Sequence, residues 1–107
     1  MAQGAPLPTR DVEQLTGELC DALLTPDTRE EMRSLLRDLC TPSELRALAE
    51  RWHVARLLDG TDFSYRDIHE GTGVSTTTIV RVGRFLRQEP NQGYRRAIDA
   101  LEAENVG

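Results

Sequence analysis

The chain has 107 residues, with 13 basic and 18 acidic side chains and a formal net charge of −5, and every basic residue is an arginine. A chain of this length allows one compact domain with a marginal core, so we expect a partner to complete its burial. No apolar stretch approaches the ~20 residues that cross a bilayer, and residues 1–10 lack the layout of a signal peptide. We therefore expect neither secretion nor membrane insertion, and a cytoplasmic location.

The charge is unevenly distributed along the chain. Residues 1–45 hold four arginines against nine acids, whereas residues 74–88 hold Arg81, Arg84 and Arg87 and no acid. The acidic total argues against nucleic acid as a partner, because nucleic-acid binders carry a basic footprint. The local excess of arginine argues for it. A net charge of −5 would then limit non-specific adhesion to DNA and leave recognition to a local patch.

Short helical patterns follow one another along the chain. We predict a disordered tail over residues 1–8 and a single domain over residues 9–104. A first helix is predicted from Thr9 to about Leu24, because apolar residues recur there at helical spacing. These residues are Val12, Leu15, Leu19 and Leu23. Thr25-Pro26 predicts the start of a second helix, with the threonine as N-cap, that runs to about Leu39.

Thr41-Pro42 repeats the same start signal, and Glu44 completes a capping box. The third helix that it opens carries the clearest apolar stripe and ends near Gly60. The stripe consists of Leu45, Leu48, Ala49, Trp52, Ala55 and Leu58. Ser64 is predicted to cap a short fourth helix over residues 65–70, which the glycines at 71–73 end.

A fifth helix is predicted to start at Ser75 or Thr76 and to run to about Gln88. A sixth follows Pro90, and the tail after Leu101 is expected to fray. The stripe of the sixth helix consists of Tyr94, Ala97, Ile98 and Leu101. Because no segment alternates convincingly with period two, we predict an all-α fold of about six helices.

The residues that could carry metal or catalytic chemistry are few. Cys20, Cys40, His53 and His69 do not have zinc-ligand spacing, so we expect no metal site. Free, buried thiols in a reducing cytoplasm are expected, with a disulfide as the weaker alternative. The two histidines lie on different predicted helices and no nucleophile, base and orienting group come together. We therefore expect neither an enzyme nor a bound cofactor.

Residues 64–88 (SYRDIHEGTGVSTTTIVRVGRFLRQ) have the layout of a helix-turn-helix, in which a short helix ends in a glycine turn and a second helix leaves at a steep angle. Gly73 would supply the positive φ of the turn. The apolar residues that would close the motif are Ile68, Val74, Ile79 and Val82.

The exposed face of the second helix of this motif would carry recognition. Hydroxyls and free N–H groups at its N-terminus can meet phosphates or base edges, and guanidinium groups can reach phosphates or guanine. The first helix would approach the DNA backbone. The predicted DNA-binding residues are Tyr65, Arg66, Ser75, Thr76, Thr77, Arg81, Arg84 and Arg87. The alternative is an ordinary helical hairpin with a solvated arginine face.

The stretch LRDLCTPSELRALAERWHVARLLDGTDFSYRDIHEGTGVSTTTIVRVGRFL resembles the Trp repressor superfamily, and in particular its YerC/YecD-type branch. The resemblance covers about residues 35–101, and its most specific pieces are Thr41-Pro42, LRALAERWHVARLL and TGVSTTTIVRVGR. It implies an intertwined, all-helical homodimer in which N-terminal helices within residues 9–40 wrap around the partner. The helix-turn-helix at residues 64–88 would then enter successive major grooves of a palindromic operator.

The resemblance also implies an effector pocket. In the Trp repressor, a tryptophan corepressor lies between the core and the reading helix and sets the angle of that helix. The positions that match pocket residues are Thr41, Arg51, Thr78 and Arg81. Arg81 would hold a carboxylate and Arg51 would stack on a planar ring. The chain departs from the family at Val82, in place of a glycine, and at Phe85, in place of a serine. These side chains would either fill the pocket or select another small carboxylate or aromatic molecule.

We therefore expect a bacterial transcriptional regulator, acting as a repressor, that binds double-stranded operator DNA as a homodimer, either independently of any ligand or under the control of tryptophan or another small corepressor. Arg51 and Arg81 could instead pair with neighbouring acids such as Glu50 and Asp67. The alternative function is a protein-interaction module that uses the helix-turn-helix without specific DNA binding. A small-molecule sensor with a different output is a third option.

Overall fold

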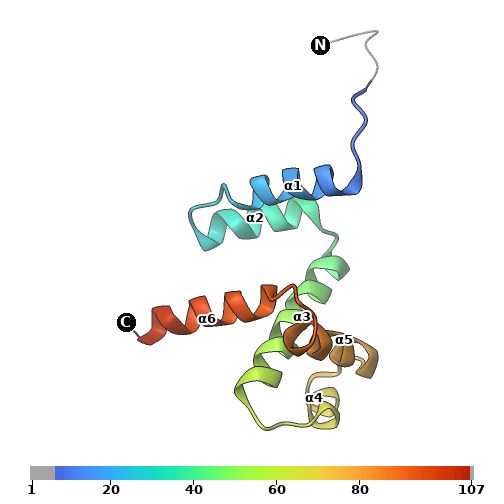
Figure 1. The fold of residues 1–107 in the computed structure, drawn as a ribbon, viewed down its shortest axis with the longest axis vertical. Coiled ribbons are helices and arrows are strands. Elements are labelled where there is room, and N and C mark those ends of the chain that lie inside the picture. The colour runs from blue at the N-terminus through green and yellow to red at the C-terminus, as the bar shows by residue number, and fades with distance from the viewer. Residues whose placement is uncertain (1–6, 107) are drawn as a thin grey trace. The chain divides into compact units, whose positions relative to one another are not determined.

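The structure is a computed structural model that describes residues 7–106. Over these residues the chain has six helices and no strand, which confirms the all-α fold. It divides into two compact units between Thr41 and Pro42. The first unit contains α1 (Val12–Leu23) and α2 (Arg29–Leu39), and the second contains α3 (Pro42–Gly60), α4 (Tyr65–Thr72), α5 (Thr76–Arg87) and α6 (Gly93–Val106) (Figure 1).

Two predictions, the disordered tail and the single domain, concern how the chain is divided. Residues 1–6 of the predicted tail lie outside the described residues. A single domain over residues 9–104 stays a prediction. Among the helices of the described part, none is long and apolar enough to cross a membrane.

The start of α1 lies three residues later than predicted. Asp11 is the N-cap, because its carboxylate accepts the backbone N–H of Gln14 at 2.8 Å. The Gln14 side chain in turn accepts the backbone N–H of Asp11 at 2.9 Å, so the pair forms a capping box. Two N–H groups that no helical carbonyl can reach are thereby satisfied, and Thr9 remains outside the helix.

The predicted start of α2 at Thr25-Pro26 is wrong. The Thr25 hydroxyl donates to the carbonyl of Ala22 at 2.8 Å and so belongs to the end of α1. Thr28 is the N-cap of α2, since its hydroxyl accepts the backbone N–H of Glu31 at 3.1 Å. Pro26 therefore lies in the connection between the two helices rather than at a first helical position.

The first unit has no core of its own. No residue of α1 or α2 is buried, and the apolar stripe predicted for the first helix is largely exposed. Val12 is 78% exposed, Leu15 54% and Leu19 42%. The expectation of buried thiols is wrong for Cys20, which is exposed on α1, while Cys40 is half-buried, and both are free. An amphipathic face without cover characterises this unit.

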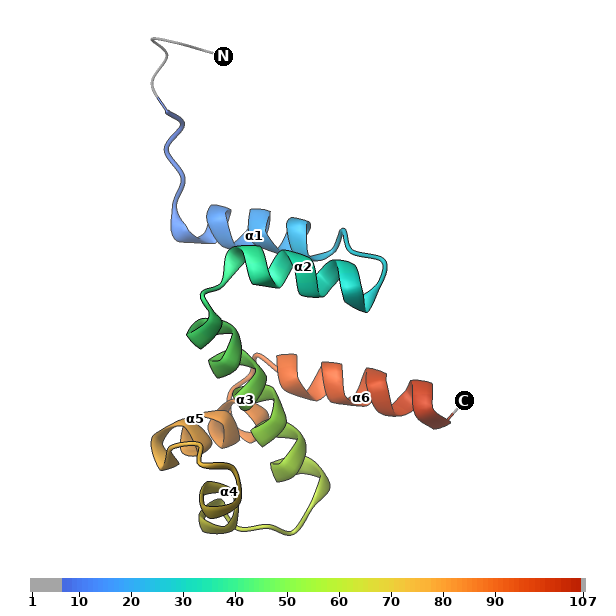
Figure 2. The ribbon, with the colours of Figure 1, turned by 180° about the vertical axis from the view of Figure 1, so that it is seen from behind.

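The second unit holds the hydrophobic core. α3 begins at Pro42 and ends at Gly60, as the sequence predicts, and α4, α5 and α6 contact it (Figure 2). The core collects apolar residues from all four helices and from the turn before α5. Its buried members are Val54, Ala55, Leu58, Ile68, Val74, Ile79, Val82, Leu86 and Ile98. This core contains every apolar residue that the sequence assigned to closing the helix-turn-helix.

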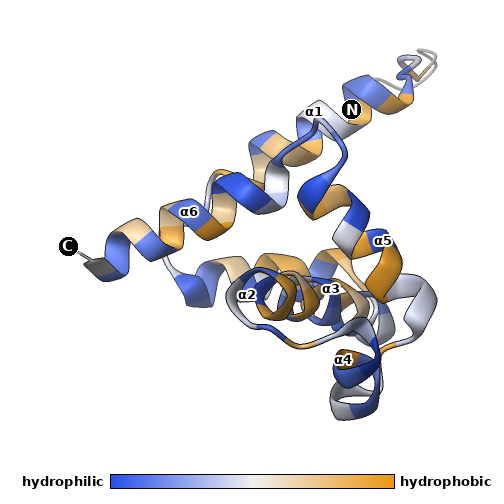
Figure 3. Cartoon of the chain, turned by 60° about the horizontal axis from the view of Figure 1, so that its bottom comes forward, coloured by the Kyte–Doolittle hydropathy of each residue, from blue (hydrophilic) through white to orange (hydrophobic). Residues whose placement is uncertain are grey.

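The last helix is longer and better anchored than predicted. α6 continues to Val106, so the expectation of fraying after Leu101 is wrong. Its ribbon alternates between hydrophobic and hydrophilic bands (Figure 3), and Ile98 is fully buried against the core. Arg95 forms two hydrogen bonds to the Asp59 carboxylate on α3, at 2.6 and 3.1 Å. These bonds hold the pKa of Asp59 below its usual range.

Candidate nucleic-acid interface

α4 begins at a capping box that the sequence predicts only in part. The Ser64 hydroxyl accepts the backbone N–H of Asp67 at 3.0 Å, and the Asp67 carboxylate accepts the backbone N–H of Ser64 at 3.0 Å. The Ser64 N–H that donates to this carboxylate, together with the Ser64 side chain, lowers the pKa of Asp67. At the other end α4 includes Gly71 and Thr72, so it ends two residues later than predicted.

The turn after α4 is held by a set of short hydrogen bonds. Gly73 has a φ of 78°, which favours glycine, and its N–H donates to the carbonyl of His69 at 2.9 Å. The Thr72 hydroxyl donates to the Ile68 carbonyl at 2.6 Å and accepts the Val74 N–H at 3.1 Å. The His69 ring donates from Nδ1 to the Val74 carbonyl at 2.7 Å. The sequence predicts the glycine turn, but not the part of His69 in it.

α5 starts directly after this turn and packs closely on α4. Ser75 is its N-cap and accepts the Thr78 N–H at 3.2 Å. The Tyr65 hydroxyl of α4 lies against Gly83, so closely that a Cβ at Gly83 would collide with it. Tyr65 is accordingly half-buried and packs on the core, and it joins α4 to α5. The buried face of α5 consists of Ile79, Val82, Gly83 and Leu86.

The opposite face of α5 is exposed and carries mixed chemistry. Thr77, Val80, Arg81 and Arg84 recur at i, i+3, i+4 and i+7, so they share one face. Val80 is 49% exposed and was not among the predicted site residues. Its helical spacing from Thr77 and Arg84 was the signal that could have identified it. Ser75 and Thr76 extend this surface to the N-terminus of the helix and are also exposed.

The predicted arginines separate into different environments. Arg81 and Arg84 lie over the Phe85 ring, at 4.5 and 5.3 Å from its centroid, and Arg84 also pairs with Glu89 at 3.3 Å. Arg66 on α4 has a side chain that is 86% exposed and pairs with Glu70 at 3.1 Å. Arg87 instead donates from Nη2 to the backbone carbonyl of Leu58 on α3 at 2.8 Å. Arg87 is exposed like Arg81 and Arg84, but of these three arginines it is the one whose guanidinium is bonded to α3.

A hollow of about 420 Å³ lies between α3, α5 and the start of α6. Four of the predicted pocket residues line it, namely Arg51, Arg81, Val82 and Phe85. Five further lining residues are Leu48, Trp52, Asn91, Gly93 and Tyr94. Leu48 and Trp52 share the α3 face of Arg51, which helical spacing could have indicated. Tyr94 belongs to the apolar stripe predicted for the sixth helix, but no local pattern marks Asn91 or Gly93 as lining residues.

The chemistry of this hollow combines cations with aromatic rings. Trp52 and Tyr94 lie with their ring centroids 6.4 Å apart. Within residues 7–106 neither Arg51 nor Arg81 forms an ion pair, so the alternative of pairing with Glu50 or Asp67 is wrong. Thr78 does not line the hollow, and its hydroxyl accepts from Ser75 at 2.9 Å. Thr41 belongs to the other compact unit. Among the described residues no group of His, Cys, Asp and Glu could hold a metal ion.

A short capped helix, a left-handed glycine turn and a second helix with an exposed polar and cationic face define a helix-turn-helix protein. The family model of the Trp repressor protein matches residues 14–102. The chain therefore belongs to the Trp repressor protein family, a family of DNA-binding regulators.

Three relatives, each from a different bacterium, agree with this assignment. The chain is 38% identical over 85 residues to the uncharacterized protein YerC of Bacillus subtilis (strain 168). The matched stretch covers 79% of this chain and 80% of YerC. It resembles the crystal structure of a TrpR-like protein from Eubacterium eligens, with a TM-score of 0.75, 37% identity and coverage of 83% and 90% of the two chains. A candidate Trp repressor from Staphylococcus aureus gives a TM-score of 0.75 at 35% identity, covering 88% and 96%.

Proposed function

We propose that this chain is a transcriptional repressor that binds a palindromic operator as a homodimer in the bacterial cytoplasm. The observation that carries the proposal is the exposed face of α5, which presents hydroxyls, a small apolar side chain and two guanidinium groups on a helix whose other face is buried. A helix with such a face can enter a major groove, where it presents both hydrogen-bond donors and an apolar contact to the bases.

Each part of that surface has a distinct role in the proposed complex. The hydroxyls and N–H groups of Ser75, Thr76 and Thr77 would bind a phosphate at the N-terminus of α5. Arg81 and Arg84 would reach base edges or phosphates, and Val80 would contact a thymine methyl group. From α4, the exposed Arg66 would bind the DNA backbone. Tyr65, in contrast, would contribute indirectly, because it packs on Gly83 and so joins α4 to α5.

The proposed homodimer is supported by the apolar surface of the first unit. Val12, Leu15 and Leu19 lie exposed on α1, and neither α1 nor α2 buries a residue. Helices that short are marginal in water unless tertiary packing covers their apolar face. A second copy would supply that cover and would give two reading helices related by a two-fold axis. Light scattering should then give twice the 12.0 kDa chain mass at micromolar concentration.

The hollow supports regulation by a small aromatic or carboxylate ligand. Arg51 and Arg81 would hold an anionic group, and the Trp52 and Tyr94 rings would contact a planar body. Thermal shift with tryptophan and related aromatic carboxylates tests this part. We expect a stabilisation that Arg51→Ala abolishes. Equal stabilisation of both proteins by every compound would contradict the assignment of the hollow.

DNA binding itself is tested with labelled genomic fragments at two salt concentrations. We expect retention of specific fragments that weakens with salt and is lost in Arg84→Ala. Arg96→Ala, on exposed α6 surface, is the matched control and should keep its affinity. If the wild-type protein retains no fragment at either salt concentration, the repressor assignment is wrong, and a protein-interaction module becomes the better account.

A further inference from the structure

Arg87 is exposed, yet its guanidinium is bonded within the chain rather than free in solvent. Its Nη2 atom donates to the backbone carbonyl of Leu58 at 2.8 Å, across 29 positions of sequence. Leu58 lies in the last turn of α3, where carbonyls lack a partner within the helix. A guanidinium there satisfies such a carbonyl and also interacts favourably with the negative end of the helix dipole. The contact fastens the C-terminal turn of α5 to α3.

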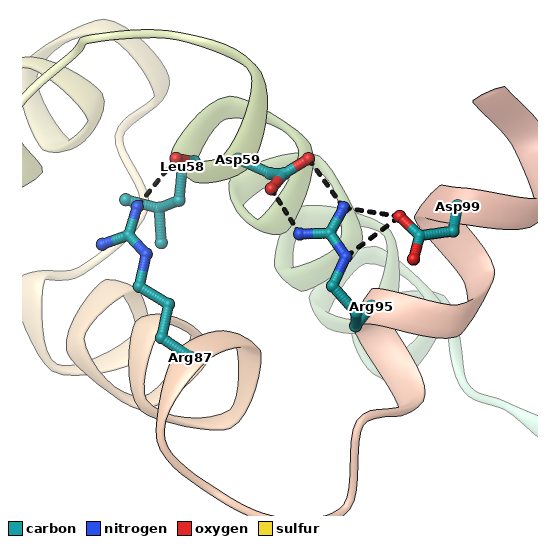
Figure 4. A network of polar contacts seen from close by, with 5 residues as sticks. All are labelled: Leu58, Asp59, Arg87, Arg95 and Asp99. Atoms are coloured by element: carbon teal, nitrogen blue, oxygen red, sulfur yellow. Dashed lines mark hydrogen bonds and ion pairs between the residues drawn. The ribbon is translucent and has the colours of Figure 1, made fainter.

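The point of attachment on α3 is itself fixed. The Leu58 side chain is 4% exposed and belongs to the core. The next residue, Asp59, accepts two hydrogen bonds from Arg95 of α6, which also donates to Asp99 (Figure 4). Figure 4 shows both guanidinium groups converging on the end of α3 from opposite sides, Arg87 from α5 and Arg95 from α6. A bond to this carbonyl therefore adds an attachment of α5 to a fixed point on α3, beside the packing of its buried face.

The other end of α5 has a similar attachment. His69 of α4 bonds to the Val74 carbonyl at 2.7 Å, and Val74 lies immediately before the N-cap Ser75. A carbonyl only accepts, so Nδ1 must carry the proton that is shared. Val74 is only 6% exposed, so little water can compete with His69 for this bond. Both ends of the helix are thus tied to neighbouring elements by one side chain each.

We infer that Arg87 and His69 are positioning residues that hold α5 in its DNA-reading orientation, and that Arg87 makes no DNA contact. The inference rests on the proposed function and specifies how its reading helix is oriented. An anchored helix spends more of its time in the competent orientation, and apparent affinity scales with that fraction. It also follows that α5 is oriented by the chain itself before any ligand enters the hollow.

The salt dependence of operator binding separates a positioning residue from a phosphate contact. Each phosphate contact that is lost lowers the slope of log affinity against log salt concentration by about 0.9. For Arg87→Ala we expect the specific affinity to fall by roughly tenfold with an unchanged slope, and the affinity for non-specific DNA to stay as in the wild type. Arg66→Ala is the matched control, because it removes an exposed cation that the proposed function does place on the backbone, and its slope should fall.

Conservative variants show whether the two carbonyl bonds are responsible. Arg87→Lys keeps a donor for the Leu58 carbonyl, and His69→Asn keeps an N–H near the position of Nδ1. We expect both to bind the operator more tightly than Arg87→Ala and His69→Ala, respectively. Circular dichroism at the binding temperature establishes that each variant is folded before its affinity is compared. Folded alanine variants with wild-type operator affinity would show a merely structural role and overturn the inference.

The failure of this inference can be told apart from failure of the proposed function. A wild-type protein that binds no fragment overturns the proposed function, and the inference falls with it. A wild-type protein that binds, together with a slope that drops in Arg87→Ala as it does in Arg66→Ala, overturns the inference alone and makes Arg87 a phosphate contact. Loss of affinity at constant slope, with rescue by Arg87→Lys, supports it.

Discussion

The two glycines that flank Thr72 should respond in opposite directions to the same substitution. Gly73 has a φ of 78°, and a Cβ added there would meet no atom within 4 Å. The cost of Gly73→Ala is therefore conformational, about 1–2 kcal/mol for an L-residue in the left-handed region. A more restricted unfolded chain offsets about 0.4–1 kcal/mol of that cost. We expect the free energy of unfolding to fall by about 1 kcal/mol.

Gly71 is the matched control for this change. It lies within α4, is exposed, and would also accept a Cβ without any contact within 4 Å. Gly71→Ala should raise the free energy of unfolding by about 0.5–1 kcal/mol, because alanine is the better helix former. Urea unfolding followed by circular dichroism measures both changes, with equal m-values as the condition for comparing them. Changes of the same sign at both positions would refute the left-handed turn as the feature that fixes α4 against α5.

Three further substitutions test how the second unit is held together. Ile98→Ala should cost about 2–5 kcal/mol of stability in urea unfolding, because the side chain is fully buried where α6 meets the core, and a cost below about 1 kcal/mol would contradict that docking. Asp59→Asn should reduce the loss of stability in acid, because the pKa of Asp59 is lowered from 3.8 in the folded state. The wild-type ion pair contributes fully above pH 3.8 and is lost as the pH falls through the folded pKa. The same dependence of stability on pH in wild type and variant would count against the pair. Ser64→Ala should cost about 1 kcal/mol in the same assay, since it removes the N-cap of α4, and Ser34→Ala, at an exposed position inside α2, should not.

Much of the fold follows from local sequence patterns, because local chemistry decides it. Thr41-Pro42 predicts the start of α3, and Gly73 predicts the turn, since a proline and a positive φ act within a few residues. The same dipeptide at Thr25-Pro26 misleads because Thr28, with Glu31 three residues later, offers the better cap. Two start signals that are three residues apart compete, and their ranking depends on how α1 ends.

The candidate site was predicted only in part, because its residues depend on contacts between distant segments. Arg84 and Arg87 look alike in a sequence, yet one lies beside Phe85 and the other is bonded to Leu58. No residue near Arg87 in the sequence indicates that it bonds to the Leu58 carbonyl, 29 positions away. The hollow shows the same limit, since Arg51 and Arg81 follow from the resemblance, whereas Tyr94 joins them only once α6 has docked.

The central claim is that the exposed face of α5 reads operator DNA from a two-fold dimer. Footprinting of the purified protein on genomic fragments that it retains tests this claim most directly. The account predicts two protected half-sites related by a two-fold axis, with their centres about one helical turn, or ~10 base pairs, apart, and loss of both in Arg84→Ala. Protection of a single, asymmetric site, or a footprint that Arg84→Ala leaves intact, would contradict it.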